Sequence, residues 1–278
     1  MSTGHQVRMA RLVDSAGPTF ILPIDDGLIS GPNGSLADPR GLVRSAVAGG
    51  ARCVLGYPGT LRQCAGCLAG AGYVQNLTAS TRLSRHTEKV LVARPLDALR
   101  NGADGVAVHI NFSASSEPAM LRNVGQVAEE CRNVDVPLLV IAYPRRDAEG
   151  GDDNYRDLRE SDPDEYTDLI SHCARAAAEL GAAIVKVPYT GSTATFKRVV
   201  TAALGTHVIV AGGEPVDDER AIQVAQDAVL AGGAGVAYGR QTFMRDASEV
   251  ETFVDRVVTA MRDAAERTTR PSLAADTG

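Results

Sequence analysis

Residues 182–213 read AAIVKVPYTGSTATFKRVVTAALGTHVIVAGG and contain one complete strand–helix–strand unit. The apolar run at 182–187 is typical of a buried strand, and residues 192–204 follow it with the pattern of an amphipathic helix. A second apolar run begins at His207 and ends in two glycines. The same order of elements recurs on both sides of this stretch, so the unit indicates how the whole chain is organised.

Strand-like runs alternate with helical stretches along the chain. Asp38-Pro39 and Asp162-Pro163 each combine an N-cap residue with Pro at the first helical position, which predicts two helix starts. We expect strands at 19–25, 52–56, 73–77, 105–111, 137–143, 182–187, 207–212 and 235–238, and helices at 39–48, 117–132, 163–180, 192–204, 217–230 and 248–266.

Eight strands in strict alternation with helices over ~250 residues predict an α/β fold, a single-domain (β/α)8 TIM barrel. A doubly wound open sheet is the alternative. No G-x-G-x-x-G follows a strand and no Walker motif is present, which disfavours nucleotide binding. We expect the barrel to occupy residues 1–267, with an N-terminal extension at 1–15 and a charged loop at 144–162 that is either a lid or a solvated insertion. Residues 268–278 are expected to form a flexible tail.

Composition excludes several classes of protein. The net charge is −6 and the charges are interspersed without a basic run, so we expect no nucleic-acid partner. No window approaches ~18 uninterrupted apolar residues, and the N-terminus lacks an apolar signal core, so we expect no membrane partner and a cytoplasmic location.

The five cysteines do not form a recognisable framework. Their number is odd and their spacing scattered, which argues against disulfides. The pair Cys64-x-x-Cys67 lies in a predicted helix, and no second pair has zinc-site spacing, so we expect no metal there.

Lys186 is unusual because it ends a buried apolar run in a chain where only three of the 28 basic residues are Lys. Arg stays protonated, whereas a desolvated Lys can become a neutral amine nucleophile for Schiff-base chemistry. The alternative is a lysine that extends from a strand end into water. The other two, Lys89 and Lys197, look ordinary: Lys89 opens a short apolar run and Lys197 lies in a mixed Phe-Lys-Arg stretch.

Polar residues end several of the predicted strands, where a barrel carries its active site. Each has a structural alternative: the acidic pair can cap a turn, Tyr143 can be a core residue, and His109 can be a hydrogen-bonded structural histidine. The occurrence of all these residues at strand ends is stronger evidence for an active site than any one of them alone. The set consists of Asp25 and Asp26 after strand one, His109 and Asn111 in strand four, Tyr143 in strand five and Lys186 in strand six.

Glycines after strands seven and eight predict a phosphate site. Gly212 and Gly213 end strand seven, and Gly239-Arg240 follows strand eight. Barrels often bind phosphate with these two loops, where glycine lets backbone N–H groups approach the anion and Arg can add a charged fork. The alternative is that the glycines serve tight turns.

These stretches together resemble the archaeal-type class I aldolase family, which groups with deoxyribose-phosphate aldolase-like barrels. The similarity covers nearly the whole chain. It rests on PIDDG at 23–27 with SGP at 30–32, PLLVIAYPR at 137–145, VKVPYTG at 185–191, AGG at 211–213 and GR at 239–240. One departure is Asp26, where the family has His, and it leaves the choice between Asp25 and Asp26 open, with alignment favouring Asp25.

The resemblance implies a Schiff-base mechanism without metal or other cofactor. Lys186 would attack a phosphorylated ketone, Asp25 would move protons during carbinolamine formation and dehydration, and Tyr143 would act as acid/base for the C–C bond. Relatives of this kind assemble into rings, so we expect a homo-oligomer. The partners are expected to be small-molecule sugar-phosphate and aldehyde substrates.

Within the family, VRMARL at 7–12 and YTG at 189–191 are most similar to the branch that uses aspartate semialdehyde. One chemistry of that branch joins it to dihydroxyacetone phosphate on a route to 3-amino-4-hydroxybenzoate, and an Arg- and Ala-rich composition favours this one. The other makes 2-amino-3,7-dideoxy-D-threo-hept-6-ulosonate for an alternative aromatic pathway. Arg145 or Arg146 would pair with the acceptor's carboxylate, unless both are solvent-exposed loop charges.

Further alternatives are a fructose-bisphosphate or deoxyribose-phosphate aldolase, and a barrel isomerase without a Schiff base. A barrel that binds sugar phosphate without catalysis is the non-enzyme alternative.

Overall fold

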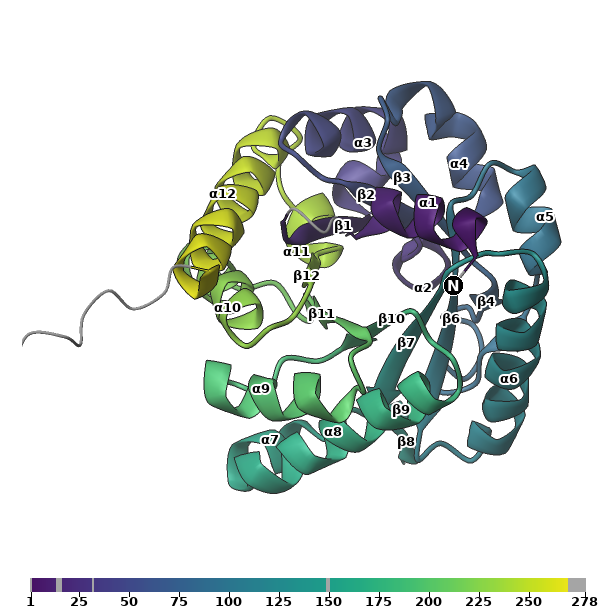
Figure 1. Ribbon diagram of the computed structural model, residues 1–278, viewed down its shortest axis with the longest axis vertical. Helices are drawn as coiled ribbons and strands as arrows, with labels where there is room; N and C mark the ends of the chain where they lie inside the picture. The colour runs from purple at the N-terminus through teal and green to yellow at the C-terminus, as the bar shows by residue number, and fades with distance from the viewer. Residues whose placement is uncertain (1, 14–16, 32, 149–150, 270–278) are drawn as a thin grey trace, which may run out of the picture.

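In the computed structural model, which describes residues 2–13, 17–31, 33–148 and 151–269, eight parallel strands close into a barrel (Figure 1). The first strand, β1, pairs with both the second and the last barrel strand, so the sheet has no open edge. This closure confirms the predicted (β/α)8 barrel and excludes the open sheet. Around the barrel the order is β1 (Thr19–Pro23), β12 (Gly235–Ala237), β11 (His207–Ala211), β10 (Ile184–Val187), β7 (Leu138–Pro144), β6 (Gly105–Phe112), β3 (Gly72–Asn76) and β2 (Cys53–Gly56).

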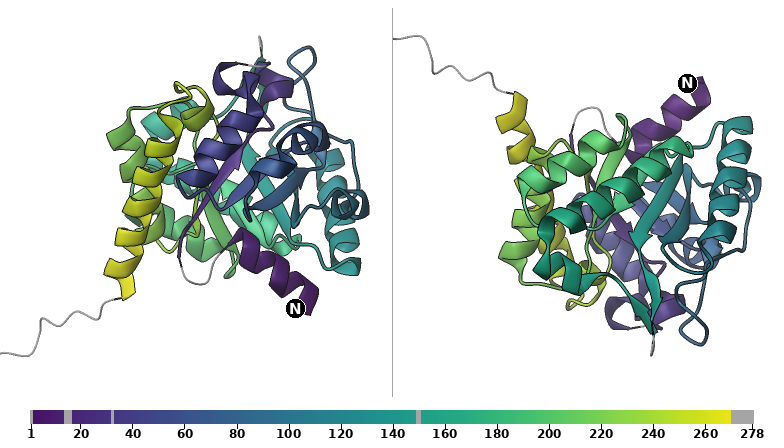
Figure 2. Two further views of the ribbon diagram at one scale, coloured as in Figure 1. Left: turned by 90° about the horizontal axis from the view of Figure 1, so that it is seen from above. Right: turned by 90° about the horizontal axis from the view of Figure 1, so that it is seen from below.

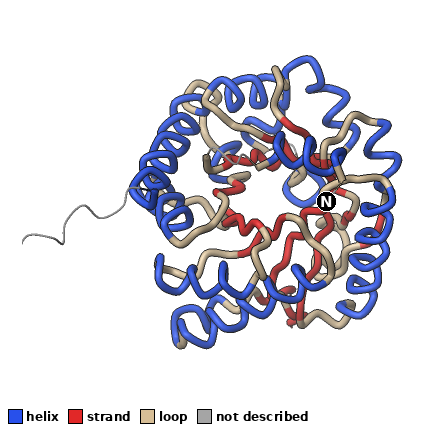
Figure 3. Tube along the Cα trace, viewed as in Figure 1, coloured by secondary structure: helices blue, strands red, loops and turns tan. Residues whose placement is uncertain are grey.

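Helices surround the strands on the outside (Figure 3). The predicted N-caps Asp38 and Asp162 accept hydrogen bonds from the amides of Gly41 and Glu165, respectively. The outer helices are α3 (Pro39–Ala48), α4 (Pro58–Cys64), α5 (Pro95–Arg100), α6 (Glu117–Asn133), α8 (Pro163–Glu179), α9 (Thr193–Ala202), α10 (Asp218–Leu230) and α12 (Val250–Thr269). Among the described residues, no helix has the length and apolar character that crossing a membrane needs.

The core has two layers because side chains alternate along each strand. One layer fills the barrel and includes Ile21, Leu139 and Ile184. The other lies between the barrel and the helices and includes Leu22 and Val185, the neighbours of inward-facing residues. Every second strand residue therefore points toward the barrel axis, and this alternation determines which strand-end residues reach the mouth of the barrel.

A helix that was expected only as an extension closes the N-terminal end of the barrel. This helix, α1 (Thr3–Leu12), places Leu12 and Val13 in the cluster inside the barrel. The Arg11 guanidinium also forms a 2.8 Å ion pair with Asp104, just before β6. Figure 2 shows α1, in purple, at the end opposite the teal hairpin of β8 and β9, so the other end is free to hold a site.

Short elements build the C-terminal end. Residues 144–162, expected as a charged loop, contain the hairpin of β8 and β9 and the helix α7 instead. Residues 149–150 and most of the predicted tail, 270–278, lie outside the described residues. The short elements are α2 (Gly27–Ser30), η1 (Gly34–Ala37), η2 (Ala65–Cys67), β4 (Thr78–Ala79), β5 (Val90–Leu91), β8 (Arg146–Ala148), β9 (Gly151–Asp153), α7 (Arg156–Ser161) and α11 (Arg240–Phe243).

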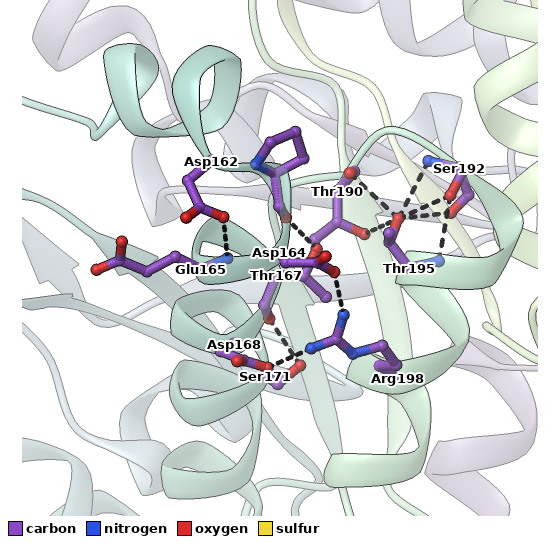
Figure 4. Close-up of polar contacts among 11 residues, drawn as sticks. Asp162, Asp164, Glu165, Thr167, Asp168, Ser171, Thr190, Ser192, Thr195 and Arg198 are labelled. Carbon is purple, nitrogen blue, oxygen red and sulfur yellow. Dashed lines mark hydrogen bonds and ion pairs between the residues drawn. The ribbon is translucent and has the colours of Figure 1, made fainter.

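The loop after β10 is fixed by a capping box at the start of α9 (Figure 4). The Ser192 hydroxyl accepts from the Thr195 amide, and the Thr195 hydroxyl accepts from the Ser192 amide, both at 3.2 Å. The Thr190 hydroxyl donates to that of Thr195 at 3.0 Å. In the same view, Arg198 of α9 pairs with Asp164 and Asp168 of α8. These contacts hold the chain on the C-terminal side of Lys186 in one conformation.

Gly235 gives a direct test of the barrel closure. It has φ +136°, and an added Cβ would lie 2.0 Å from the carbonyl oxygen of Thr19, its partner on β1. Gly235→Ala should therefore lower the free energy of unfolding by about 2–4 kcal/mol, from backbone strain and overpacking together. The measurement is urea unfolding followed by circular dichroism.

Gly125→Ala is the matched control, because Gly125 lies inside α6 and an added Cβ would meet nothing within 4 Å. It should leave stability unchanged or raise it by up to about 1 kcal/mol. Equal unfolding midpoints for the two variants would contradict the proposed closure contact.

Candidate active site

A cavity of about 320 Å³ opens at the C-terminal end of the barrel. Its walls come from strand ends and from the loops that follow them, which is where TIM barrels carry their active sites. The structure brings all ten residues predicted as catalytic or substrate-binding to this one cavity: Asp25, Asp26, His109, Tyr143, Arg145, Lys186, Gly212, Gly213, Gly239 and Arg240.

Lys186 reaches the cavity because of its position in β10. Ile184 belongs to the cluster inside the barrel and Val185 to the outer layer, so Lys186 points inward again, one step nearer the mouth. Its side chain is buried, with 8% exposed. That burial argues against a lysine that simply extends into solvent, and it places an amine on the cavity wall.

Asp25 and Asp26 both line the cavity, but their surroundings differ. The carboxylate of Asp25 accepts a 2.7 Å hydrogen bond from the Asn76 amide at the end of β3. Burial raises the pKa of Asp25, while the positive charge of Lys186 and the Asn76 hydrogen bond act to lower it. Asp26 instead accepts from the Ser30 hydroxyl within α2. The electrostatic coupling to Lys186 therefore favours Asp25 as its carboxylate partner.

Tyr143 points inward from β7, two residues after Ile141 of the barrel interior. Its ring packs edge-on against His109 with a centroid separation of 5.1 Å. Burial, together with the nearby charges of Lys89 and Arg145, holds the pKa of His109 well below its usual value. His109 is therefore a neutral imidazole, and its Nε2 lies 3.0 Å from Asn111 Oδ1. Asn111 itself does not line the cavity.

Arg145 and Arg146, both considered for the acceptor's carboxylate, lie in different places. Arg145 lines the cavity, and its Nε donates to Asn154 Oδ1 at 2.6 Å. Arg146 is on β8, where its guanidinium lies 4.7 Å from the ring centroid of Tyr155 and away from the cavity lining. Of these two arginines, only Arg145 is therefore placed to contact a molecule that binds in the cavity.

The predicted phosphate loops meet at one side of the cavity. Gly213 has φ +63°, in the left-handed region, and a Cβ on Gly212 would lie 3.0 Å from the Tyr238 ring. The Gly212 amide donates to the Ala237 carbonyl at 3.1 Å, so its N–H is already hydrogen-bonded within the barrel. What this glycine provides is the close approach of the backbone that a missing side chain allows. The second loop brings Arg240 to the same side.

Glu214, which the sequence did not single out, connects this side to α7. Its Oε1 accepts from Arg240 at 2.6 Å and from Arg156 at 3.0 Å. Burial acts to raise the pKa of Glu214, but the two guanidinium groups outweigh it and hold that pKa below its usual value. A carboxylate therefore lies beside the arginine that was predicted to bind phosphate.

Several other polar residues of the cavity were missed. Asn76 is the last residue of β3, one residue before the end of the predicted strand 73–77, and could have been found by the rule that found Asp25. Lys89 was taken as ordinary, yet it is buried and lines the cavity. The cysteines of the C-x-x-C pair are buried, and the described residues contain no group of three or more His, Cys, Asp or Glu that could hold a metal. The missed cavity residues include Tyr57, Asn76, Thr78, Ser80, His86, Lys89, Asn154 and Glu214.

Comparison with known families agrees with this geometry. The model of the DeoC/LacD family aldolase matches residues 19–245, from the first barrel strand to beyond the last. The chain belongs to this family. The resemblance inferred from the motifs is thereby confirmed.

Two curated relatives are similar over most of their length. The 2-amino-3,7-dideoxy-D-threo-hept-6-ulosonate synthase of Halobacterium salinarum is 35% identical over 241 residues, 86% of this chain and 85% of the relative. The 2-amino-4,5-dihydroxy-6-oxo-7-(phosphonooxy)heptanoate synthase of Streptomyces griseus is 30% identical over 226 residues, 81% of this chain and 78% of the relative.

Among solved structures, an archaeal fructose-1,6-bisphosphate aldolase with its catalytic Lys bound to a carbinolamine intermediate superimposes with a TM-score of 0.80. It is 23% identical and covers 93% of this chain and 99% of its own, a likeness that shows the fold. Together with the family match, these relatives identify the chain as an enzyme, a class I aldolase. The non-enzyme alternative is set aside.

The hydrogen bond between Asn76 and Asp25 predicts how the pKa of Asp25 changes when Asn76 is replaced. The Asn76 amide stabilises the charged carboxylate and so lowers the pKa of Asp25. Asn76→Ala should therefore move the Asp25 titration to higher pH. Carbon-13 NMR of aspartate-labelled protein would follow it directly.

Asn101→Ala is the matched control, because the Asn101 amide donates to Gln75 and does not line the cavity. An Asp25 titration that stays at the same pH in Asn76→Ala would show that this hydrogen bond does not tune the carboxyl group.

Proposed function

We propose that this aldolase joins dihydroxyacetone phosphate to L-aspartate 4-semialdehyde through a Schiff base on Lys186, giving a C7 amino-sugar-acid phosphate on a route to 3-amino-4-hydroxybenzoate. The observation that carries the proposal is a buried lysine that shares one cavity with Asp25, Tyr143 and two glycine-containing phosphate loops. The relative from Streptomyces griseus bears the name of a synthase with a seven-carbon phosphorylated product, which supports the choice of substrates.

The donor half-reaction begins with the neutral amine of Lys186. Its nitrogen attacks the C2 carbonyl carbon of dihydroxyacetone phosphate, and the carbonyl oxygen takes up a proton to give a carbinolamine. Loss of that oxygen as water leaves an iminium ion, an electron sink that acidifies C3. Asp25, which is electrostatically coupled to Lys186, transfers protons to and from this oxygen and nitrogen.

The second half-reaction forms the C–C bond. Removal of a proton from C3 gives an enamine, and its C3 attacks the aldehyde carbon of the acceptor while the aldehyde oxygen accepts a proton. Tyr143, on the strand next to Lys186, acts as the acid/base of this step. Water then adds to the product iminium, the ketone is released, and Lys186 is free again.

Substrate groups are assigned to the cavity walls by charge. Gly213, Gly239 and Arg240 bind the donor phosphate, while Gly212, whose N–H is bonded to Ala237, contributes only a close approach of the backbone. Arg145 pairs with the acceptor's carboxylate, and His109 contributes a neutral hydrogen-bonding imidazole. Asp26 adds negative charge, which favours an acceptor with an ammonium group, as in aspartate semialdehyde.

A second candidate is 2-amino-3,7-dideoxy-D-threo-hept-6-ulosonate synthesis, favoured by the 35% identity to the relative from Halobacterium salinarum. It would use the same Lys186 chemistry with a deoxy-ketohexose phosphate as donor. Fructose-bisphosphate cleavage is the remaining alternative. The cytoplasmic location and the homo-oligomer expected from the sequence stay predictions.

Borohydride trapping tests the proposal. Reduction in the presence of dihydroxyacetone phosphate should leave a stable adduct on Lys186, located by peptide mass spectrometry, because borohydride reduces the iminium to an amine. Lys186→Met should lose at least about 10³-fold in kcat/KM, since the nucleophile is removed. Lys197→Met, on the exposed surface of α9, is the matched control and should keep full activity.

The outcome of the trapping experiment distinguishes between the candidate functions. An adduct only with the deoxy-ketohexose phosphate would favour the heptulosonate pathway. Absence of an adduct with either ketone would overturn the role of Lys186. Once an adduct is found, aspartate semialdehyde is the first acceptor to be assayed.

Arg240→Ala tests the phosphate site. A charge-assisted hydrogen bond contributes about 1.5–3 kcal/mol, so the KM for dihydroxyacetone phosphate should rise roughly 10- to 100-fold with a smaller change in kcat. Steady-state kinetics with varied donor would measure this. Arg256→Ala is the control, since Arg256 pairs with Asp218 and Glu219 outside the cavity. A donor KM that stays the same in Arg240→Ala would exclude Arg240 from the phosphate site.

A further inference from the structure

The barrel order places two sides of the cavity opposite each other. The predicted phosphate loops follow β11 and β12, and each of these strands lies four positions around the barrel from β3 or β6. In a closed ring of eight strands, four positions are half the circumference, so β3 and β6 face the phosphate loops across the mouth. Lys186 and Tyr143 lie on β10 and β7, on the path between the two sides.

Three polar residues after β3 form what we call the acceptor-side cluster: Ser80, His86 and Lys89. Lys89 Nζ donates to Ser80 Oγ at 2.6 Å and contacts His86 Nδ1 at 3.1 Å. All three line the cavity, and Lys89 is only 5% exposed. They lie in the loop between β4 and β5, a hairpin that begins two residues after β3 and contacts β6.

The cluster carries positive charge and no titrating imidazole at neutral pH. Burial, together with the positive charges of Lys89, Arg145 and Arg240, lowers the pKa of His86 to about 3. His86 is therefore neutral, and because its Nδ1 accepts from the Lys89 ammonium, its proton lies on Nε2. A buried ammonium and an imidazole N–H thus lie on one wall of a polar cavity.

We propose that the acceptor-side cluster binds the carboxylate of the acceptor aldehyde, with Lys89 as its cation. This inference rests on the proposed function, because that function requires the donor phosphate and the acceptor to lie on opposite sides of the Schiff-base carbon. With the phosphate at β11 and β12 and the nitrogen on β10, the bond-forming carbon faces β7, β6 and β3. An anionic acceptor that extends from this carbon toward β6 and β3 therefore contacts Lys89.

Burial of the ammonium gives a physical reason for such a ligand. A charged group in a cavity shielded from bulk water gains more from an anion than the same group on an open surface. Arg145 lines the same cavity as Lys89, and its charge also acts to lower the pKa of both His86 and His109. Lys89 and Arg145 therefore form a two-cation site for a carboxylate, and Lys89 determines specificity for a charged over a neutral aldehyde.

Lys89→Met tests the inference with three acceptors of different charge. Aspartate semialdehyde carries a carboxylate, glyceraldehyde 3-phosphate carries a phosphate, and propanal is neutral. Because a hydrogen bond to a charged group contributes about 1.5–3 kcal/mol, kcat/KM for aspartate semialdehyde should fall roughly 10- to 100-fold, while that for propanal stays the same. Lys197→Met is the matched control and should change neither.

Borohydride trapping with dihydroxyacetone phosphate alone separates this inference from the proposed function. The donor adduct on Lys186 should form in Lys89→Met as in the unchanged enzyme, because Lys89 acts only on the acceptor. A missing adduct in the unchanged enzyme would overturn the Schiff-base proposal and this one with it. A normal adduct with an unchanged preference for aspartate semialdehyde over propanal would overturn the role of Lys89 alone.

Two further outcomes decide the ligand. A loss confined to glyceraldehyde 3-phosphate would overturn the carboxylate assignment in favour of a phosphorylated acceptor. If Lys89→Met fails to fold, Ser80→Ala carries the test, because it removes a hydroxyl that orients the ammonium and leaves the charge in place. It should lower kcat/KM for aspartate semialdehyde several-fold and leave propanal unchanged, and equal effects on both acceptors would overturn the proposal.

Discussion

Burial of the Lys186 side chain is the constraint on which the rest of the cavity depends. An ammonium group inside an apolar barrel would carry a large desolvation cost, so the residues around it must be polar. Asp25, Asn76, His109 and Tyr143, which line the same cavity, meet this demand. Below this layer the inward residues are apolar again, and α1 closes the far end. The barrel therefore separates a dry interior from one polar mouth.

Charge within the mouth is divided between its two sides. On the side of β11 and β12, Glu214 shares its carboxylate between Arg240 and Arg156 and offsets their charge when no substrate is bound. A phosphate that binds Arg240 must compete with this carboxylate, which lowers affinity and favours dianionic over monoanionic ligands. On the side of β3 and β6, burial, together with the charges of Lys89 and Arg145, lowers the pKa of His86 and His109 and keeps both neutral. In the proposed mechanism, proton transfer is therefore assigned to Asp25 and Tyr143.

The fold and most of the site could be predicted because both follow from the period of two along a strand. Apolar runs predicted the eight strands to within about two residues, and the polar residues expected at their ends, apart from Asn111, line one cavity. Lys89 and His86 escaped this reasoning since β4 and β5 have only two residues each and show no periodic pattern. The position of Glu214 could not be predicted either, because it depends on a contact with Arg156, which lies 58 residues away in the sequence.

The sequence left two interpretations of residues 144–162, a lid and a solvated insertion. Their contacts favour a different one, in which the segment is a fixed part of the cavity wall. Asp147 of β8 accepts from the Thr87 hydroxyl at 2.5 Å, close to Lys89 in the chain. That hydrogen bond and the Ser115 amide lower the pKa of Asp147 to about 2, so the tie persists at neutral pH. Asn154 contacts Arg145, and Arg156 contacts Glu214. One segment thereby contacts both the proposed acceptor side and the proposed phosphate side, so we expect a change in its sequence to alter both.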